Sequence, residues 1–250
     1  MTADRAPLDH LTHLERESAR FADVVELGPT DAAVTSCPGW DLRKLGLHIG
    51  RVQRWATIAA ATGVEPDREV FRSAPADDQE LGTWLRNGTA TLVETLRAVD
   101  PDTPTWHLFP GVPLVAGIWR RRQAHEILVH RWDAEAAIGR TTPLDAELAS
   151  DGIDEYFGVM LPRLLEREQL AVPDSTLHVH CTDVAGEWLV QRGGDGQLDV
   201  LREHAKGTAA LRGPAAALLL HLWGRRGGDG TIDIAGDADA ASDWLALGGA

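Results

Sequence analysis

Several side chains that can bind a metal lie in one segment, RRRQAHEILVHRWDAEAA, which spans residues 120–137. If this segment is helical, Glu126 and His130 are four residues apart, and their side chains point toward the same place. Burying a carboxylate and an imidazole without partners is costly, and a divalent metal is the simplest partner for both. We therefore predict that Glu126 and His130 are metal ligands. A buried Glu–His ion pair without a metal is the alternative.

The same helical stripe continues to Asp133, almost one turn beyond His130. Asp133 could orient an imidazole as a supporting carboxylate. His125 is five residues before His130, so the two side chains diverge by about 140° around the helix, and we place His125 outside the ligand set. Four charged residues fall on the opposite side of the helix, where we expect water: Arg120, Arg121, Arg131 and Glu135.

A third ligand must come from another helix. In the stretch CPGWDLRKLGLHIG, residues 37–50, His48 lies among the apolar positions of a predicted helix. A lone histidine there is more often a packed core residue, but a buried Glu–His pair opposite it makes a ligand an equal alternative. Two histidines and one glutamate form a catalytic zinc set with a fourth position open. Cys37 is interpreted as a turn residue rather than a nucleophile, because no base lies near it in the sequence.

Other histidines give weaker signals. His178 and His180 alternate in a predicted strand and share a face, so they could bind a metal or face solvent, and we favour solvent. The remaining histidines show no converging partners in the sequence: His10, His13, His107, His204 and His221. No P-loop, GxGxxG or GxSxG pattern occurs, so nucleotide-binding and serine-hydrolase functions have no support.

The elements that position these residues fall into two regions. Apolar periodicity with start and stop signals predicts helices at 8–27, 41–61, 78–99 and 115–138. We interpret residues 1–140 as a four-helix bundle and residues 141–250 as an α+β domain with a small, mainly antiparallel sheet. In the second region we expect helices at 145–167, 214–226 and 237–247, and strands at 176–183, 187–193, 197–203 and 231–236.

Composition limits the function further. The chain has 250 residues, a formal net charge of −14 and only two cysteines. This charge argues against nucleic-acid binding, and no run of about 18 apolar residues or secretory signal is present. We expect a cytoplasmic protein with free thiols that acts on a small molecule and makes no membrane contact. We expect it to be a monomer or a weak homo-oligomer.

Four segments occur in an order that resembles the mycothiol-dependent maleylpyruvate isomerase family: CPGWDLRKLGLHIGRVQRW, RRRQAHEILVHRWDAE, LHVHCTDVAGEWLV and LLLHLWGRR. The resemblance implies a DinB-like metal-binding bundle followed by a sterol-carrier-like α+β domain. It implies zinc bound by His48, Glu126 and His130, and mycothiol as the thiol cofactor. It also implies that Arg225, or else Arg226, holds an anionic substrate. The alternative for Arg225 is ordinary compensation of the charge at a helix C-terminus.

The expected chemistry is addition of a zinc-activated thiol to a small electrophile. Rotation and elimination then give cis–trans isomerisation, which we favour, whereas keeping the thioether gives a mycothiol S-transferase. A non-catalytic ligand-binding or regulatory module is the alternative outside enzymes. A zinc hydrolase would have only Asp133 as an obvious general base. We predict two catalytic residues, Asp133 and Arg225, and Arg225 would oppose the carboxylates of the substrate.

Overall fold

The computed structural model describes residues 8–225 and 231–248. The chain divides into two compact units. The helical unit comprises the described residues up to His107 together with 113–142, and the second unit comprises 108–112 and the described residues from Pro143 onward. Among the described residues, no helix has the combination of length and apolar character that crossing a bilayer requires.

Four long helices build the helical unit, as the sequence predicts: α1 (His10–Leu27), α2 (Leu42–Thr62), α4 (Leu81–Ala98) and α5 (Gly117–Ala137). Their starts follow from capping, because the Asp9 and Asp41 side chains accept hydrogen bonds from the backbone N–H groups of Thr12 and Lys44. Gly63 ends α2 in the left-handed conformation, with φ of 74°. The helix α3 (Arg68–Phe71) was not predicted, and the first turn of the helix predicted at 78–99 is a 3₁₀ turn, η1 (Asp78–Glu80).

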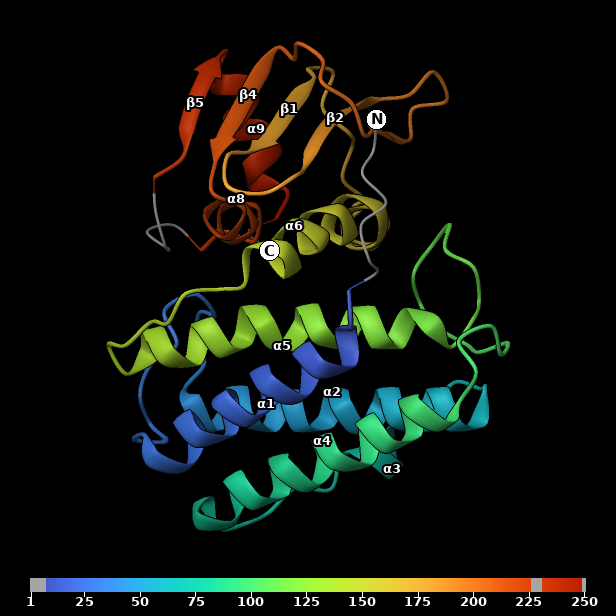
Figure 1. The fold of residues 1–250 in the computed structure, drawn as a ribbon, viewed down its shortest axis with the longest axis vertical. Coiled ribbons are helices and arrows are strands. Elements are labelled where there is room, and N and C mark those ends of the chain that lie inside the picture. Colours follow the sequence, from blue (N-terminus) through green and yellow to red (C-terminus); the bar gives the residue numbers. More distant parts are fainter. Residues whose placement is uncertain (1–7, 226–230, 249–250) are drawn as a thin grey trace. The chain divides into compact units, whose positions relative to one another are not determined.

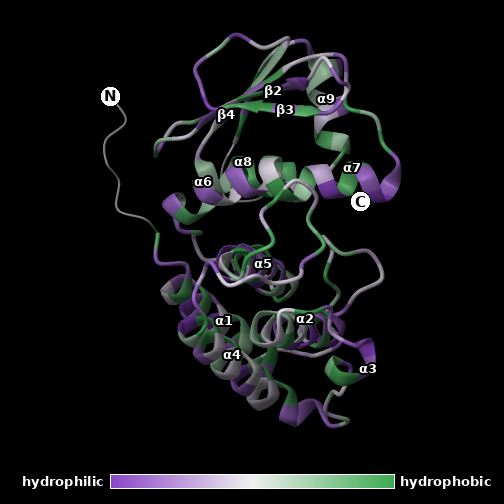
Figure 2. Cartoon of the chain, turned by 90° about the vertical axis from the view of Figure 1, so that its right-hand side faces the viewer, coloured by the Kyte–Doolittle hydropathy of each residue, from purple (hydrophilic) through white to green (hydrophobic). Residues whose placement is uncertain are grey.

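The four long helices pack against one another, α1 on α4 and α5, and α2 on α4 and α5 (Figure 1). Hydrophobic and hydrophilic residues are interleaved along α1 and α4 (Figure 2), as expected for amphipathic helices with one apolar face. Gly50 permits one close approach, since a Cβ there would lie 1.9 Å from the Trp84 ring. The Arg54 guanidinium lies over the same ring, 3.8 Å from its centroid.

The prediction that one side of α5 faces water is wrong. Arg131 is fully buried, and Glu135 is 5% exposed. The Arg131 guanidinium donates to Glu17 of α1 at 2.6 Å and to Glu135 at 2.8 Å, so the buried charges are paired. Arg120 is half-buried and donates to backbone carbonyl oxygens of α4 and the residue after it, and Arg121 is half-buried too.

The second unit begins with α6 (Ala146–Glu155), a π-helical turn, η2 (Tyr156–Met160), and α7 (Leu161–Glu168), which together cover the predicted helix at 145–167. A five-stranded sheet follows, with the order β3-β2-β1-β4-β5. Its strands are β1 (Leu177–Cys181), β2 (Glu187–Arg192), β3 (Leu198–Leu201), β4 (Ala209–Gly213) and β5 (Asp233–Gly236). Two helices complete the unit, α8 (Ala215–Leu222) and α9 (Ala238–Ala246).

The sheet is mainly antiparallel, as predicted, and only the β1–β4 pair is parallel. The strand β4 was not predicted, because AALRG has neither a clear alternation nor β-branched residues. Leu177 and Val179 on β1 and Leu211 on β4 are fully buried, and α8 and α9 contact both strands. The predicted fold class, α+β with a helical N-terminal region, is confirmed.

Candidate metal centre

The helical unit brings the three predicted ligands together. His48 comes from α2, and Glu126 and His130 come from neighbouring turns of α5. Oε1 of Glu126 lies 3.0 Å from Nε2 of His48 and 3.5 Å from Nε2 of His130. One ligand atom from each residue lies within 4.8 Å of the other two. The i, i+4 spacing on α5 and the packing of α2 on α5 produce this convergence.

Glu126 is held as an anion. Its Oε2 accepts a hydrogen bond from Nη2 of Arg122 at 2.5 Å, one turn earlier on α5. Burial opposes the charge, but Arg122 and the hydrogen bonds with His130 and His48 outweigh it and hold the pKa of Glu126 well below its ordinary value. The carboxylate therefore offers an ionised oxygen between two imidazoles, which is the form that binds a metal.

His130 has a second carboxylate partner. Nδ1 of His130 lies 2.8 Å from Oδ2 of Asp133, whose side chain is fully buried. Burial alone would lower the pKa of His130, but the hydrogen bonds with Asp133 and Glu126 raise it to about 9. Asp133 thus lies where an orienting carboxylate is expected, on the ring nitrogen that does not face His48 and Glu126.

A tight loop between α1 and α2 completes the surroundings of Asp133. Ser36 donates to Oδ1 of Asp133 at 2.6 Å, and Sγ of Cys37 lies 4.0 Å from Oδ2. Gly39, with φ of 79°, lets the loop turn back, and the N–H of Trp40 donates to the carbonyl of Cys37 at 2.9 Å. Cys37 is a turn residue as predicted, but the fold also brings a carboxylate to it that its sequence neighbours do not provide.

Aromatic side chains adjoin the three ligands. The Trp40 and His48 rings meet edge to face with centroids 5.0 Å apart. The His48 and His130 rings lie 5.3 Å apart. His125 is 2% exposed, and its ring meets the ring of His10 edge to face with centroids 5.8 Å apart. This contact involves none of the three predicted ligands.

Two arginines on the helices that carry this set were not predicted to take part in a site. Arg122 precedes Glu126 by four residues, a spacing that could have indicated the ion pair. Arg51 follows His48 by three residues on α2, so the two side chains leave the same side of the helix. Nε of Arg51 is buried and has no hydrogen-bond partner among the described residues. Such an unsatisfied donor is a candidate contact for an anionic ligand.

The predicted substrate-binding arginine belongs to the second unit. Arg225 follows α8, and its Nη1 donates to the carbonyl oxygen of Trp223 at 2.7 Å. Arg226, the alternative, lies outside the described residues.

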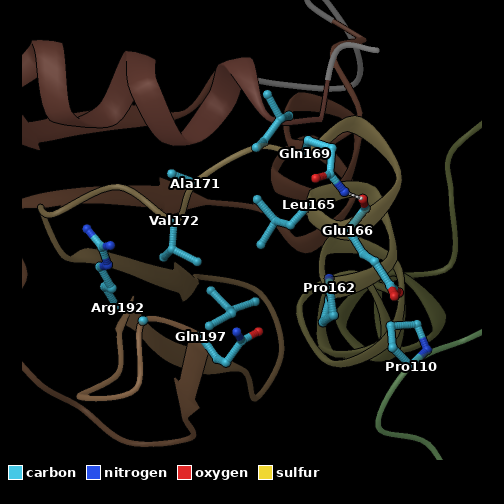
Figure 3. Close-up of a pocket in the computed structure, with 12 residues that line it drawn as sticks. Pro110, Pro162, Leu165, Glu166, Gln169, Ala171, Val172, Arg192 and Gln197 are labelled. Atoms are coloured by element: carbon cyan, nitrogen blue, oxygen red, sulfur yellow. Dashed lines mark hydrogen bonds between the residues drawn. The ribbon is translucent and has the colours of Figure 1, made fainter.

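The second unit also contains a pocket of about 650 Å³ (Figure 3). It lies between α7 and the connection of β2 to β3, and its lining is mostly apolar, with Glu166 and Arg192 as its charged members. Arg192 forms an ion pair with Asp174 at 2.7 Å. None of the three predicted ligands lines this pocket, so the pocket is not part of the candidate metal centre.

Comparisons with known proteins cover most of the chain. The family model of the Mycothiol maleylpyruvate isomerase N-terminal domain matches residues 11–135, and that of the MDMPI C-terminal domain matches residues 147–243. A crystal structure of the mycothiol-dependent maleylpyruvate isomerase has a TM-score of 0.59 and 12% identity, covering 92% of this chain and 93% of that chain. A histidine-to-alanine mutant of that enzyme gives a TM-score of 0.58 and 13% identity, with the same coverage. No curated protein matches the sequence.

Proposed function

This chain belongs to the mycothiol maleylpyruvate isomerase family, and from that membership we propose that it is a zinc-dependent, mycothiol-using isomerase of a small anionic substrate. The observation that carries the proposal is the approach of His48 and His130 to one oxygen of Glu126, at 3.0 and 3.5 Å. The family supports the thiol and the isomerase class. The side-chain geometry supports the metal and its ligands.

The donor set fits zinc. Two imidazole nitrogens and one carboxylate oxygen make up a three-ligand set of the kind found in catalytic zinc sites, where a fourth position stays open. Glu126 is 18% exposed and ionised, and Arg122 balances its charge from the side away from His48. When bound, zinc would act as a Lewis acid and lower the pKa of a thiol at the open position.

Asp133 has a positioning role in this proposal. Asp133 accepts a hydrogen bond from Nδ1–H of His130, so loss of the Nε2 proton on metal binding would leave the lone pair of Nε2 for the ion. Ser36 holds the other oxygen of Asp133, so the ring and its carboxylate are fixed together. This arrangement reduces the reorganisation that ligand binding requires. The side chain of Asp133 is fully buried and contacts His130. In this proposal Asp133 therefore positions the His130 ring and does not itself contact the substrate.

Arginines are proposed to bind the substrate's negative charge. Arg225 is the family-derived candidate, since a guanidinium can form paired, charge-assisted hydrogen bonds with a carboxylate. Arg51 is a second candidate, because its buried Nε has no partner among the described residues and His48 lies one turn earlier on the same helix. Either guanidinium would favour a substrate that carries a carboxylate group.

The decisive experiment follows two products at once. Purified protein with zinc and mycothiol is incubated with maleylpyruvate, while isomer conversion and adduct mass are recorded. Conversion without an accumulating adduct supports the isomerase, and a stable adduct supports the alternative, a mycothiol S-transferase. The His130→Ala variant is the control, and it should lose both zinc and turnover. Metal-replete protein that produces neither product would contradict the proposal.

A further inference from the structure

A second group of metal-binding side chains lies on the sheet of the second unit. His178 and His180 are two residues apart on β1, so they share one face of the sheet. Glu187 of β2 pairs directly with His180 in the antiparallel register, and His204 follows β3. Strand pairing therefore gathers three imidazoles and a carboxylate from three parts of the chain.

The four side chains converge closely. One ligand atom from each lies within 4.8 Å of the others. The three imidazole centroids are 5.4 to 6.3 Å apart, and Nδ1 of His204 is 3.1 Å from Oε2 of Glu187. Nδ1 of His180 contacts the other oxygen of the same carboxylate. Glu187 thus links two of the imidazoles, while a third approaches them.

His178 lies at the buried end of this group. It is 8% exposed, and its Nε2 has no hydrogen-bond partner among the described residues. A buried nitrogen without a partner costs free energy, and a native structure normally satisfies it. The expectation that His178 faces solvent is therefore wrong, and so is the expectation that His204 has no converging partners. The alternation along β1 predicts that His178 and His180 share a face. It does not predict that Glu187 and His204 lie beside them on that face.

We propose that His178, His180, Glu187 and His204 form a second zinc site. Three imidazole nitrogens and one carboxylate oxygen supply the four ligands of a tetrahedral zinc ion, so the protein itself fills every position. A closed site of this kind is structural rather than catalytic. Zinc there satisfies Nε2 of His178 and ties the segment after β3 to β1 and β2. The site is separate from the His48 centre, and neither assignment depends on the other.

The test counts zinc in the full chain. Protein stripped by a chelator is titrated with zinc against a chromophoric competitor, and bound metal is measured after gel filtration. We expect a second zinc ion per chain that persists when the first centre is removed by His48→Ala with His130→Ala. Adding His204→Ala should lower the affinity for that remaining zinc ion by more than about 100-fold. Losing a ligand costs more than losing a residue that only hydrogen-bonds to a ligand, which lowers affinity by about 10- to 100-fold.

His204 is the safest residue to change, since its side chain is 79% exposed and its loss leaves the core intact. His178→Ala should remove the same ion, with circular dichroism as the check on folding. The matched control is His221→Gln, because His221 lies in the same unit and donates only to its own helix in the contacts described, at 2.8 Å to the Ala217 carbonyl. That variant should keep both ions. A chain that binds no zinc after the His48 centre is removed, or whose remaining ion is insensitive to His204→Ala and His178→Ala, overturns the proposal.

Discussion

Asp133 contacts the ring nitrogen of His130 that faces away from Glu126. The Nδ1–Oδ2 distance is 2.8 Å, whereas Nε2 of the same ring lies 3.5 Å from Oε1 of Glu126. One imidazole therefore connects a fully buried carboxylate to a partly exposed one. This geometry decides which nitrogen is presented to a metal, and it makes Asp133 testable separately from the ligands.

Asp133→Asn should lower zinc affinity by about 10- to 100-fold, because the amide replaces a charged acceptor at almost the same size. Competition titration with a chromophoric chelator measures the change. Ser36→Ala serves as the control, since it removes one hydrogen bond from Asp133 but leaves its charge, and we expect a smaller loss. Unchanged affinity in the asparagine variant would show that Asp133 does not position His130.

Arg225→Ala should reduce kcat/KM for an anionic substrate by about 10- to 100-fold, which corresponds to the loss of a charged hydrogen bond. The loss should be much smaller for an uncharged electrophile, because no carboxylate is left unpaired. Arg225→Lys keeps the charge and should retain part of the activity. If unfolding free energy falls while kinetics with both substrates stay unchanged, the contact with the Trp223 carbonyl is the main role of Arg225.

The buried cluster around Arg131 should dominate the stability of the helical unit. Arg131→Met removes the buried guanidinium from Glu17 and Glu135, which keep Arg16 and Thr142 among the partners described, so we expect a loss of about 3 kcal/mol in unfolding free energy. Urea unfolding measures it. The matched control is Arg97→Met, which breaks an exposed ion pair with Glu15 and should cost at most about 1 kcal/mol. Equal losses in the two variants would contradict the prediction.

The two cysteines should differ sharply in reactivity. Burial, together with Asp183, raises the pKa of the Cys181 thiol to about 12, so the reactive thiolate is almost absent at about pH 8. Cys37 is half-buried and is the thiol that reagents can reach. A disulfide reagent should modify one thiol quickly and the second only after unfolding. Cys37→Ser should remove the fast phase, and fast labelling in that variant would contradict the assignment.

Gly50→Ala should disturb the helix that carries His48. The added Cβ would lie 1.9 Å from the Trp84 ring, which Arg54 covers, so we expect a loss of about 1–3 kcal/mol in unfolding free energy and weaker zinc binding. Gly46→Ala on the same helix is the control, because its nearest contact is the flexible end of Leu81 at 3.1 Å. Thermal unfolding measures both variants. Equal stability of Gly50→Ala and the unmodified chain would contradict the proposed packing constraint.

The sequence by itself determined what acts within a turn or two of helix. Asp41 and Gly63 mark the ends of one predicted helix because their effects on the backbone are local, and the structure confirms that helix. The spacing of Glu126 and His130 fixed their shared direction in the same way. The alternating strands and their turns likewise indicated an α+β second region before any long-range contact was known.

Only the tertiary structure decided which distant residues meet. Arg131 reaches Glu17 across 114 residues, so a charged position that the helical period assigns to water is buried and paired. His204 joins His178 because β1, β2 and β3 pair in register, which no local pattern specifies. His48 meets Glu126 because α2 packs against α5, which neither segment specifies by itself. Local periods fix the direction of a side chain, and chain packing fixes the partner it finds there.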